Sequence, residues 1–130
     1  TLTPFWFGDE LIHVHGNCKW DEPYPYITSM TSAYPKTMEV GSYEANDFGL
    51  FDTHGNVWEW CLDGWDREAY RKEGRTDPFV DYLNSSSRVA RGGSWASGSR
   101  NCRSSIRYYD APESRANIFG FRIVLLLWTD

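Results

Sequence analysis

The fold is decided by GLFDTHGNVWEW at residues 49–60, which joins a polar turn to an alternating aromatic segment. Residues 49–56 are rich in the Gly, Asn and Asp that form turns, and they carry apolar anchors at Leu50 and Phe51. Residues 57–61 alternate aromatic with polar or small side chains, a pattern typical of a β-strand. The sequence therefore predicts a strand over 57–61 that begins directly after a tight loop.

Other predicted elements are short and lie mostly after this segment. Residues 1 to about 45 keep neither a helical nor a strand period for long, and prolines and glycines interrupt them. Two later runs are predicted to be strands, and the second is the most hydrophobic stretch: residues 88–91 and 120–125. Three segments are weaker: a short strand at 11–15, a short helix at 66–72, and a helix or a strand at 102–107.

The composition is that of a single folded domain with an unusual core. The chain has 130 residues, 17% of them aromatic, with seven tryptophans, yet the hydrophobic fraction is 41% and the mean hydropathy is −0.57. Aliphatic residues are scarce, so Trp and Tyr must supply much of the core with their polar ends hydrogen-bonded. We therefore expect a loop-rich α+β fold, one domain over residues 1–130.

Charge and hydropathy exclude several classes of function. Thirteen Lys and Arg against eighteen Asp and Glu give 13 − 18 = −5, which disfavours a nucleic-acid binder that relies on phosphate attraction. No apolar run approaches the roughly 20 residues of a membrane-spanning helix. The chain opens at Thr1 without a signal-peptide pattern, so the cytoplasm is the default expectation, and the missing initiator Met suggests a cut start.

The three cysteines, Cys18, Cys61 and Cys102, are too few and too widely spaced for a disulfide framework or a zinc site. Small buried hydrophobes are the expected role. A Cys61–Cys102 bridge is the alternative.

Five arginines are spread through the second half of this acidic chain, beside Trp, Gly and Ser motifs. Solvated surface positions are the ordinary role of single arginines. Planar guanidinium groups that pair with carboxylates and loop carbonyls are the alternative, and the two readings stay open. The residues are Arg91, Arg103, Arg107, Arg115 and Arg122.

Four blocks in order carry a family resemblance: residues 49–60, RGGSW at 91–95, CRS at 102–104, and GFR at 120–122. Together they resemble the formylglycine-generating enzyme (sulfatase-modifying factor) family. The resemblance implies a C-type-lectin-like fold with a few central strands. It also implies that an Arg-Leu-Pro-x-Glu-x-Glu-Trp-Glu block precedes Thr1, so we expect this chain to be the C-terminal part of a domain.

The same resemblance implies a structural calcium site. Asp52 and Glu59 would supply carboxylate oxygens, and Gly55 and Val57 would supply backbone carbonyls. Calcium takes six to eight oxygen ligands from a flexible loop, which suits this segment chemically. A merely solvated acidic turn is the alternative.

Catalytic members of the family hold copper with a pair of cysteine thiolates, because Cu(I) requires soft ligands. By the resemblance, Ser97 occupies the first of these positions, and Cys102 resembles the structural cysteine of non-catalytic relatives. One thiol cannot replace two, so copper and formylglycine-generating activity are not expected. A degenerate oxidase remains one alternative.

Another branch of the family consists of the variable proteins of diversity-generating retroelements, which use this fold to bind ligands. Residues 91–122 follow their layout of fixed motifs separated by changeable residues. Adenine-directed mutagenesis does not produce Lys, Glu, Gln, Met or Trp, and the twelve positions expected to vary hold none of these. They are Ala96, Ser97, Gly98, Ile106, Tyr108, Tyr109, Asp110, Ala111, Ser114, Ala116, Asn117 and Ile118.

We therefore expect a non-catalytic domain that presents these positions to an unknown protein ligand, with Tyr108 and Tyr109 as rigid aromatic contacts. Alanine at either tyrosine should weaken binding but leave folding nearly intact. A non-diversified accessory domain of a larger signalling or surface protein is a further alternative.

Overall fold

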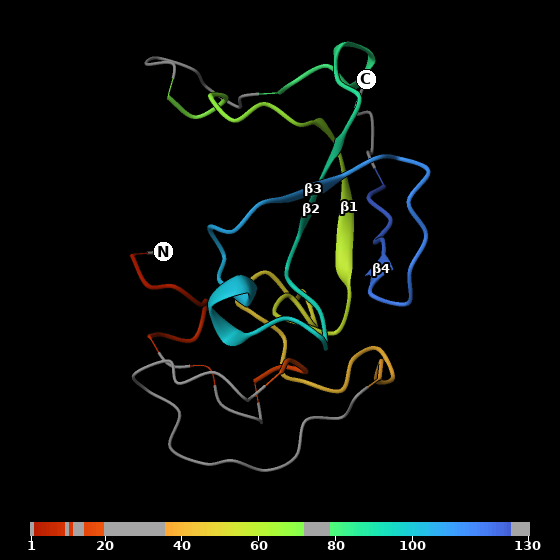
Figure 1. The fold of residues 1–130 in the computed structure, drawn as a ribbon. Coiled ribbons are helices and arrows are strands. Elements are labelled where there is room, and N and C mark those ends of the chain that lie inside the picture. Colours follow the sequence, from red (N-terminus) through yellow and green to blue (C-terminus); the bar gives the residue numbers. More distant parts are fainter. Residues whose placement is uncertain (1, 10, 12–14, 20–35, 72–78, 126–130) are drawn as a thin grey trace.

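The strand predicted after the turn is the centre of the structure. It forms β1 (Trp58–Gly64), which pairs antiparallel with β2 (Arg88–Arg91) and parallel with β4 (Phe119–Gly120). On its other side, β2 pairs antiparallel with β3 (Tyr108–Asp110). The sheet order is therefore β3-β2-β1-β4, with loops at both ends (Figure 1).

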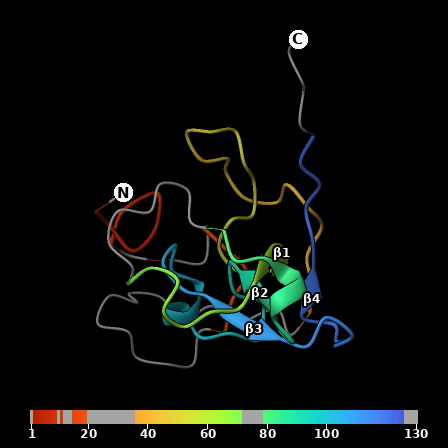
Figure 2. The same cartoon turned by 90° about the horizontal axis from the view of Figure 1, so that it is seen from above.

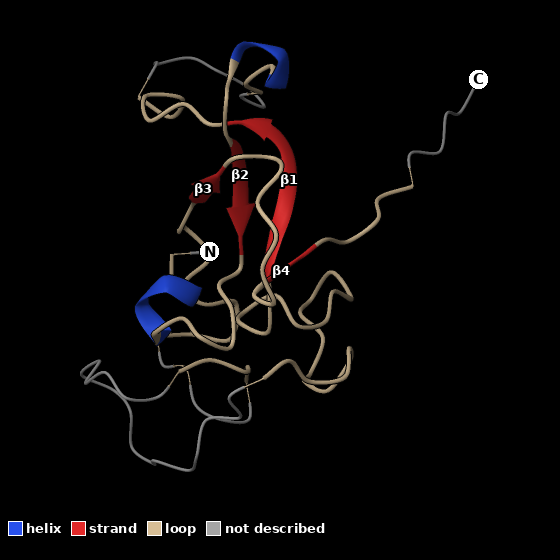
Figure 3. Ribbon diagram, turned by 45° about the vertical axis from the view of Figure 1, so that its right-hand side comes forward, coloured by secondary structure: helices blue, strands red, loops and turns tan. Residues whose placement is uncertain are grey.

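The computed structural model describes residues 2–9, 11, 15–19, 36–71 and 79–125. Helical structure in these ranges consists of two 3-10 helices, η1 (Tyr82–Asn84) and η2 (Ser99–Cys102). They lie at opposite ends of the sheet, η1 before β2 and η2 after it (Figure 3). Neither is long or apolar enough to cross a membrane.

The register places aromatic side chains of neighbouring strands together. Trp60 lies opposite Ala90, and Ala90 lies opposite Tyr108, so these three residues share one face of the sheet. The pairing of β1 with β2 is interrupted by an irregularity between Trp60 and Gly64. Loops surround this small sheet (Figure 2).

Two strand predictions are confirmed, and three predictions of regular structure are corrected. The strand at 57–61 is observed as Trp58–Gly64, and the strand at 88–91 has the predicted bounds. Of the strand predicted at 120–125, only Gly120 lies in one, at the end of β4. Residues 121–125 leave the sheet with no strand beside them in the described chain (Figure 3). Their side chains are exposed. An apolar run forms a strand only where a partner supplies hydrogen bonds.

The predicted helix at 66–72 is a series of turns as far as residue 71. The Asp66 carboxylate accepts from the Glu68 amide at 2.8 Å, which favours a turn at this point. The open choice at 102–107 is settled as turns that follow η2. The weak strand at 11–15 includes residues 12–14, which lie outside the described residues.

One part of the core is a small cluster of buried side chains at the N-terminal segment and η2. Phe5, Leu11, Cys18 and Cys102 form one buried cluster, with Phe7 packed against it. All three cysteines are free, so a Cys61–Cys102 bridge is wrong and the buried-hydrophobe role holds for Cys18 and Cys102. Cys61 lies half-buried on β1, and its sulfur faces the Glu59 carbonyl.

Aromatic stacking supplies much of the packing around β1 and β2, where Val89 and Ala90 are also buried. Tyr108 stacks on Trp58 with ring centroids 5.1 Å apart, and Trp60 stacks on Phe119 at 4.6 Å. Trp58 itself is only 5% exposed. Stacked aromatic pairs contribute about 0.5–1.5 kcal/mol each beyond the area that they bury.

Four of the five arginines bind carboxylates or loop carbonyls, so the second of the two readings holds for them. Three of them donate to backbone carbonyls: Arg91 to that of Ile106, Arg103 to that of Arg100, and Arg107 to that of Asp66. Arg122 donates to the Glu59 carboxylate. The Arg107 guanidinium also lies over the rings of Trp65 and Tyr70. Arg115 is exposed.

His54 connects the turn before β1 to η2. Its Nδ1 donates to the Cys102 carbonyl at 2.7 Å, and its Nε2 accepts from the Trp6 amide at 3.4 Å. The neutral ring with its proton on Nδ1 satisfies both bonds. Burial lowers the pKa of His54, although the bond to Cys102 acts in the opposite direction.

Trp58→Ala is expected to lower the free energy of unfolding by about 3–5 kcal/mol, because it leaves a cavity beneath Tyr108. Tyr108→Ala removes the other ring of the same stack, but Tyr108 is 40% exposed, so a loss of only about 0.5–1.5 kcal/mol is expected. Urea unfolding measures both. Equal losses of unfolding free energy in the two variants would place Tyr108 in the core and contradict its assignment to the exposed surface.

Acidification should destabilise the fold through His54. Well above pH 6.5 the His54 ring is neutral in both the folded and the unfolded chain. As the pH falls below about 6.5, the unfolded chain binds the proton first, because the pKa of His54 is lower in the folded state. The free energy of unfolding therefore decreases until the pH reaches the folded pKa. Protonation would also turn Nε2 into a donor facing the Trp6 amide. In urea unfolding between pH 7 and pH 5, roughly the range of this titration, His54→Gln should flatten the dependence. An unchanged slope in that variant would refute this origin.

Candidate functional site

A cleft of about 610 Å³ opens between β1, the start of β3 and the segment that follows Trp95. Trp58 lies at its base, packed under the ring of Tyr108. Six of the twelve positions predicted to vary line this cleft: Ala96, Ser97, Gly98, Ile106, Tyr108 and Ile118. The fold thus brings residues that are up to 22 positions apart, 96 to 118, to one opening.

Serine hydrogen bonds fix the first wall of the cleft. The Ser97 hydroxyl bonds the Ser94 hydroxyl at 2.9 Å and accepts from the Ser94 amide, while the Ser94 hydroxyl accepts from the Ala96 amide. Below this turn, Gly93 has φ +82°, and a Cβ atom there would lie 2.4 Å from the Cys102 sulfur. Glycine is therefore required at position 93, and the serine bonds that follow it hold residues 96–98 at the cleft.

The other six predicted positions lie on the outer surface beyond the cleft. Tyr109 is half-exposed and stacks on Trp65 with ring centroids 4.3 Å apart. The Asp110 carboxylate accepts from the Ala111 amide and from the Ser114 hydroxyl, both at 2.8 Å, and so closes the turn after β3. Ala111, Ala116 and Asn117 are exposed.

Sequence reasoning missed three residues of the cleft, namely Lys19, Asn101 and Arg107. Lys19 comes from a distant segment and reaches the cleft through backbone contacts: its amide donates to the Ser97 carbonyl at 2.9 Å, and it forms a parallel bridge with Gly98. Nothing in the local sequence could signal that crossing. Arg107 was recognised as a candidate pairing arginine, but not as a wall of this site.

The thiol of Cys102 does not face the cleft. Cys102 is fully buried, and its sulfur lies 3.8 Å from the Gly98 carbonyl on the inner side of η2. A hydrogen bond with the Cys18 side chain, together with burial, raises the pKa of the Cys102 thiol well above its usual value. At neutral pH this sulfur is therefore a protonated core group and not a thiolate ligand.

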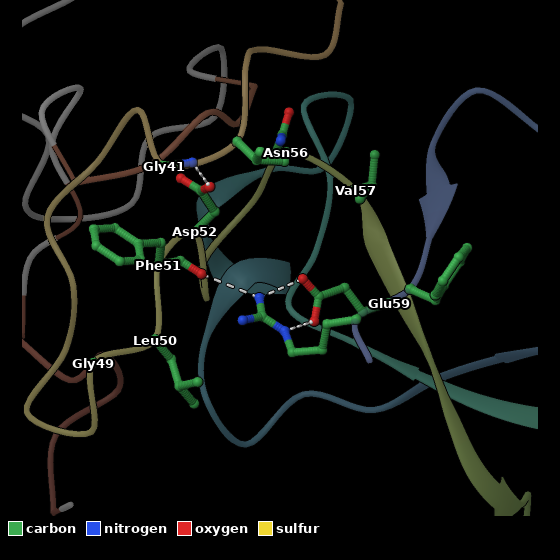
Figure 4. A pocket seen from close by; sticks show the side chains of 11 residues that line it. Gly41, Gly49, Leu50, Phe51, Asp52, Asn56, Val57 and Glu59 are labelled. Carbon is green, nitrogen blue, oxygen red and sulfur yellow. Dashed lines mark hydrogen bonds and ion pairs between the residues drawn. The ribbon is translucent and has the colours of Figure 1, made fainter. Parts of the chain in front are cut away.

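The predicted calcium loop lines a separate pocket of about 460 Å³ (Figure 4). Asp52, Val57 and Glu59 line it, but Gly55 does not. Gly55 lies instead against the Asn17 backbone, where a Cβ atom would approach the carbonyl oxygen to 2.2 Å. The structure therefore brings together three of the four predicted ligands.

The two carboxylates of this pocket differ in their hydrogen-bond partners. The Glu59 carboxylate binds the Arg122 guanidinium through two bonds of 2.5 Å, which raises the pKa of Arg122 (Figure 4). One Asp52 oxygen accepts from the Gly41 amide at 2.5 Å, whereas the other, Oδ1, is buried without a partner. An unpartnered buried carboxylate oxygen is costly unless a cation or a donor approaches it.

The donor set suits a hard cation only in part. In the described ranges, no group of three or more His, Cys, Asp or Glu side chains converges on a possible metal position. Backbone carbonyls would therefore have to complete a calcium shell. The unpartnered Asp52 oxygen fits a ligand role, while Glu59 could join only by sharing its oxygens with Arg122.

The Sulfatase-modifying factor enzyme 1-like domain matches residues 3–127. Among relatives, a formylglycine-generating enzyme of Streptomyces coelicolor is 33% identical over 121 residues, which cover 89% of this chain and 38% of that protein. A serine/threonine-protein kinase pkn1 of Chlamydia caviae is 35% identical over 94 residues, 66% of this chain and 14% of the kinase. The chain thus spans well under half the length of these relatives.

Two solved structures are similar to this one. Treponema denticola variable protein 1 superposes with a TM-score of 0.58 at 35% identity, covering 66% of this chain and 31% of that one. PvdO from Pseudomonas aeruginosa gives a TM-score of 0.63 at 30% identity, covering 81% and 42%. The fold is the loop-rich α+β, C-type-lectin-like fold that the motifs predicted, and the chain belongs to the sulfatase-modifying factor enzyme 1-like family.

Proposed function

We propose that this chain is a non-catalytic ligand-binding domain of the retroelement-diversified type, and that its partner is a protein. The observation that carries the proposal is the convergence of six predicted variable positions on one cleft. None of the twelve is fully buried, so each can change without opening a void in the core. Similarity to Treponema denticola variable protein 1 supports the same assignment.

Side chains of the cleft suit contact with a protein. Tyr108 offers a ring that is held against Trp58 and is still 40% exposed, so it loses little conformational freedom on binding. Small residues at Ser97 and Gly98 leave space for a partner's side chain beside it. Aromatic anchors among small and polar residues are typical of surfaces that bind varied protein partners.

An oxidase is the main competing function, because relatives carry the name formylglycine-generating enzyme. Against it, the Ser97 hydroxyl is bound to Ser94, and the Cys102 sulfur faces the core. A hydroxyl and a buried thiol do not form the soft pair that copper requires. An accessory domain of a larger protein is the other alternative, and similarity to a segment of the pkn1 kinases favours it.

Diversification makes a specific prediction about the DNA. A reverse-transcriptase gene should lie near the locus, with a near-copy of the region encoding residues 91–122 that differs at adenines. In a sequenced population, substitutions should concentrate at the twelve positions. The region encoding residues 49–60 is the matched control and should stay constant. Substitutions spread evenly over both regions would reject diversification and leave the accessory-domain function.

We further propose that the pocket around Asp52 holds a structural calcium ion, with Glu59 and the Val57 carbonyl as the other protein ligands, and that Gly55, the fourth predicted ligand, instead packs the loop against Asn17. The unpartnered Asp52 oxygen supports this assignment. A bound cation would give that oxygen its missing partner. It would also pin the loop that leads into β1, next to the strand on which the cleft is built.

Calcium should raise the melting temperature by about 5–10 °C at a hundredfold excess over its Kd. Asp52→Asn should abolish the shift, whereas Asp47→Asn, an exposed carboxylate of the same loop, should leave it unchanged. Magnesium is the metal control, since it demands a stricter octahedral geometry. Identical melting temperatures in calcium and in a chelator would overturn the calcium site and leave the proposal of a protein-binding cleft unaffected.

A further inference from the structure

Cys18 and Cys102 are two cysteines from distant parts of the chain that meet in the core. They lie 102 − 18 = 84 positions apart, and both are 0% exposed. They belong to the same buried cluster, between Phe5 and Leu11. Both are free thiols in this structure.

Backbone contacts hold together the two segments that carry these cysteines. The Lys19 amide donates to the Ser97 carbonyl at 2.9 Å, and Lys19 forms a parallel bridge with Gly98. The Cys102 sulfur lies 3.8 Å from the Gly98 carbonyl. Hydrogen bonding to the Cys18 side chain is the first cause that raises the pKa of the Cys102 thiol, which agrees with the place of both residues in one buried cluster.

We propose that Cys18 and Cys102 are a cross-linking site, at which a disulfide oxidant joins the segment 15–19 covalently to η2. With oxidised glutathione, the Cys18 and Cys102 thiols lose two electrons and two protons as their S–S bond forms. The glutathione disulfide bond breaks, and its two sulfurs leave as two glutathione thiols carrying those protons. Cys61 does not take part, because it lies on β1 with its sulfur facing the Glu59 carbonyl.

The cross-link would act on the ligand cleft. Lys19 on one side, and Ser97, Gly98 and Asn101 on the other, line the cleft directly beside the two cysteines. Joining them would hold the two walls at a fixed separation. This consequence rests on the proposed function, whereas the chemistry of the two thiols does not.

The experiment refolds the full chain in a glutathione redox buffer, so that burial of the thiols does not limit the reaction. Intact mass should fall by two hydrogen atoms relative to the reduced protein, and peptide mapping should find a Cys18–Cys102 link. The melting temperature should rise by about 5–10 °C, as expected for a disulfide that closes a long loop. Cys61→Ser is the matched control and should behave like the wild type.

Cys18→Ala and Cys102→Ala should each abolish both the link and the rise in melting temperature. Circular dichroism of the reduced variants tests whether they fold, and one folded variant is enough. A chain that stays reduced while folded, or a map that finds Cys61 in the bridge, would overturn the proposal. Slower hydrogen exchange at the Lys19 amide in the oxidised protein would locate the effect at the cleft wall, whether or not a protein ligand binds there.

Discussion

The fold depends on a backbone crossing where residues 16–17 lie against the turn at 54–56. A Cβ atom on Gly16 would lie 2.3 Å from the His54 carbonyl oxygen, and one on Gly55 would lie 2.2 Å from that of Asn17, so glycine is required on both sides. The crossing is closed by the Asn56 amide, which donates to the Asn17 carbonyl at 2.7 Å. The same turn reaches the RGGSW motif through two more bonds, Gly55 to Gly92 and Trp95 to Asn56. One three-residue turn thus fixes the start of β1, the end of β2 and the N-terminal segment.

This crossing would allow a small sheet to support the changeable surface that the proposed function requires. The hydrogen bonds that join this turn to Asn17, Gly92 and Trp95 use backbone atoms, which do not depend on side-chain identity, and the His54 ring and the Asn56 side chain add bonds of their own. The stacked rings of Trp58 and Trp60 lie on the side of β1 that faces Tyr108 and Phe119. Among the predicted variable positions that line the cleft, Tyr108 adds a stack on Trp58 and Ser97 adds a bond to Ser94. On the proposed function, substitution at the other four would change what a partner meets more than it changes the fold.

Local patterns predicted what local interactions determine. The alternation of Trp58, Glu59 and Trp60 located β1, and the RGGSW and CRS motifs located the cleft wall, because these features depend on neighbouring residues. The apolar run at 121–125 misled the strand prediction, since a strand also needs a partner that no local pattern supplies. Lys19 entered the cleft, and Cys18 met Cys102, through a contact between distant segments. Gly55 lies outside the expected metal pocket for the same reason: it packs closely against the Asn17 backbone, which comes from a distant segment.

The residue at position 97 and the orientation of Cys102 distinguish a copper-binding site from the cleft that is observed here. The Ser97 side chain faces the cleft and is tied to Ser94, while the thiol five positions later turns inward to Cys18. A copper pair would need sulfur at the first position and a thiol turned outward at the second. The second change would have to leave the Cys102 carbonyl in place, because that carbonyl accepts from the His54 ring of the turn at 54–56. On the proposed function, a few side chains at the cleft would decide what this fold does.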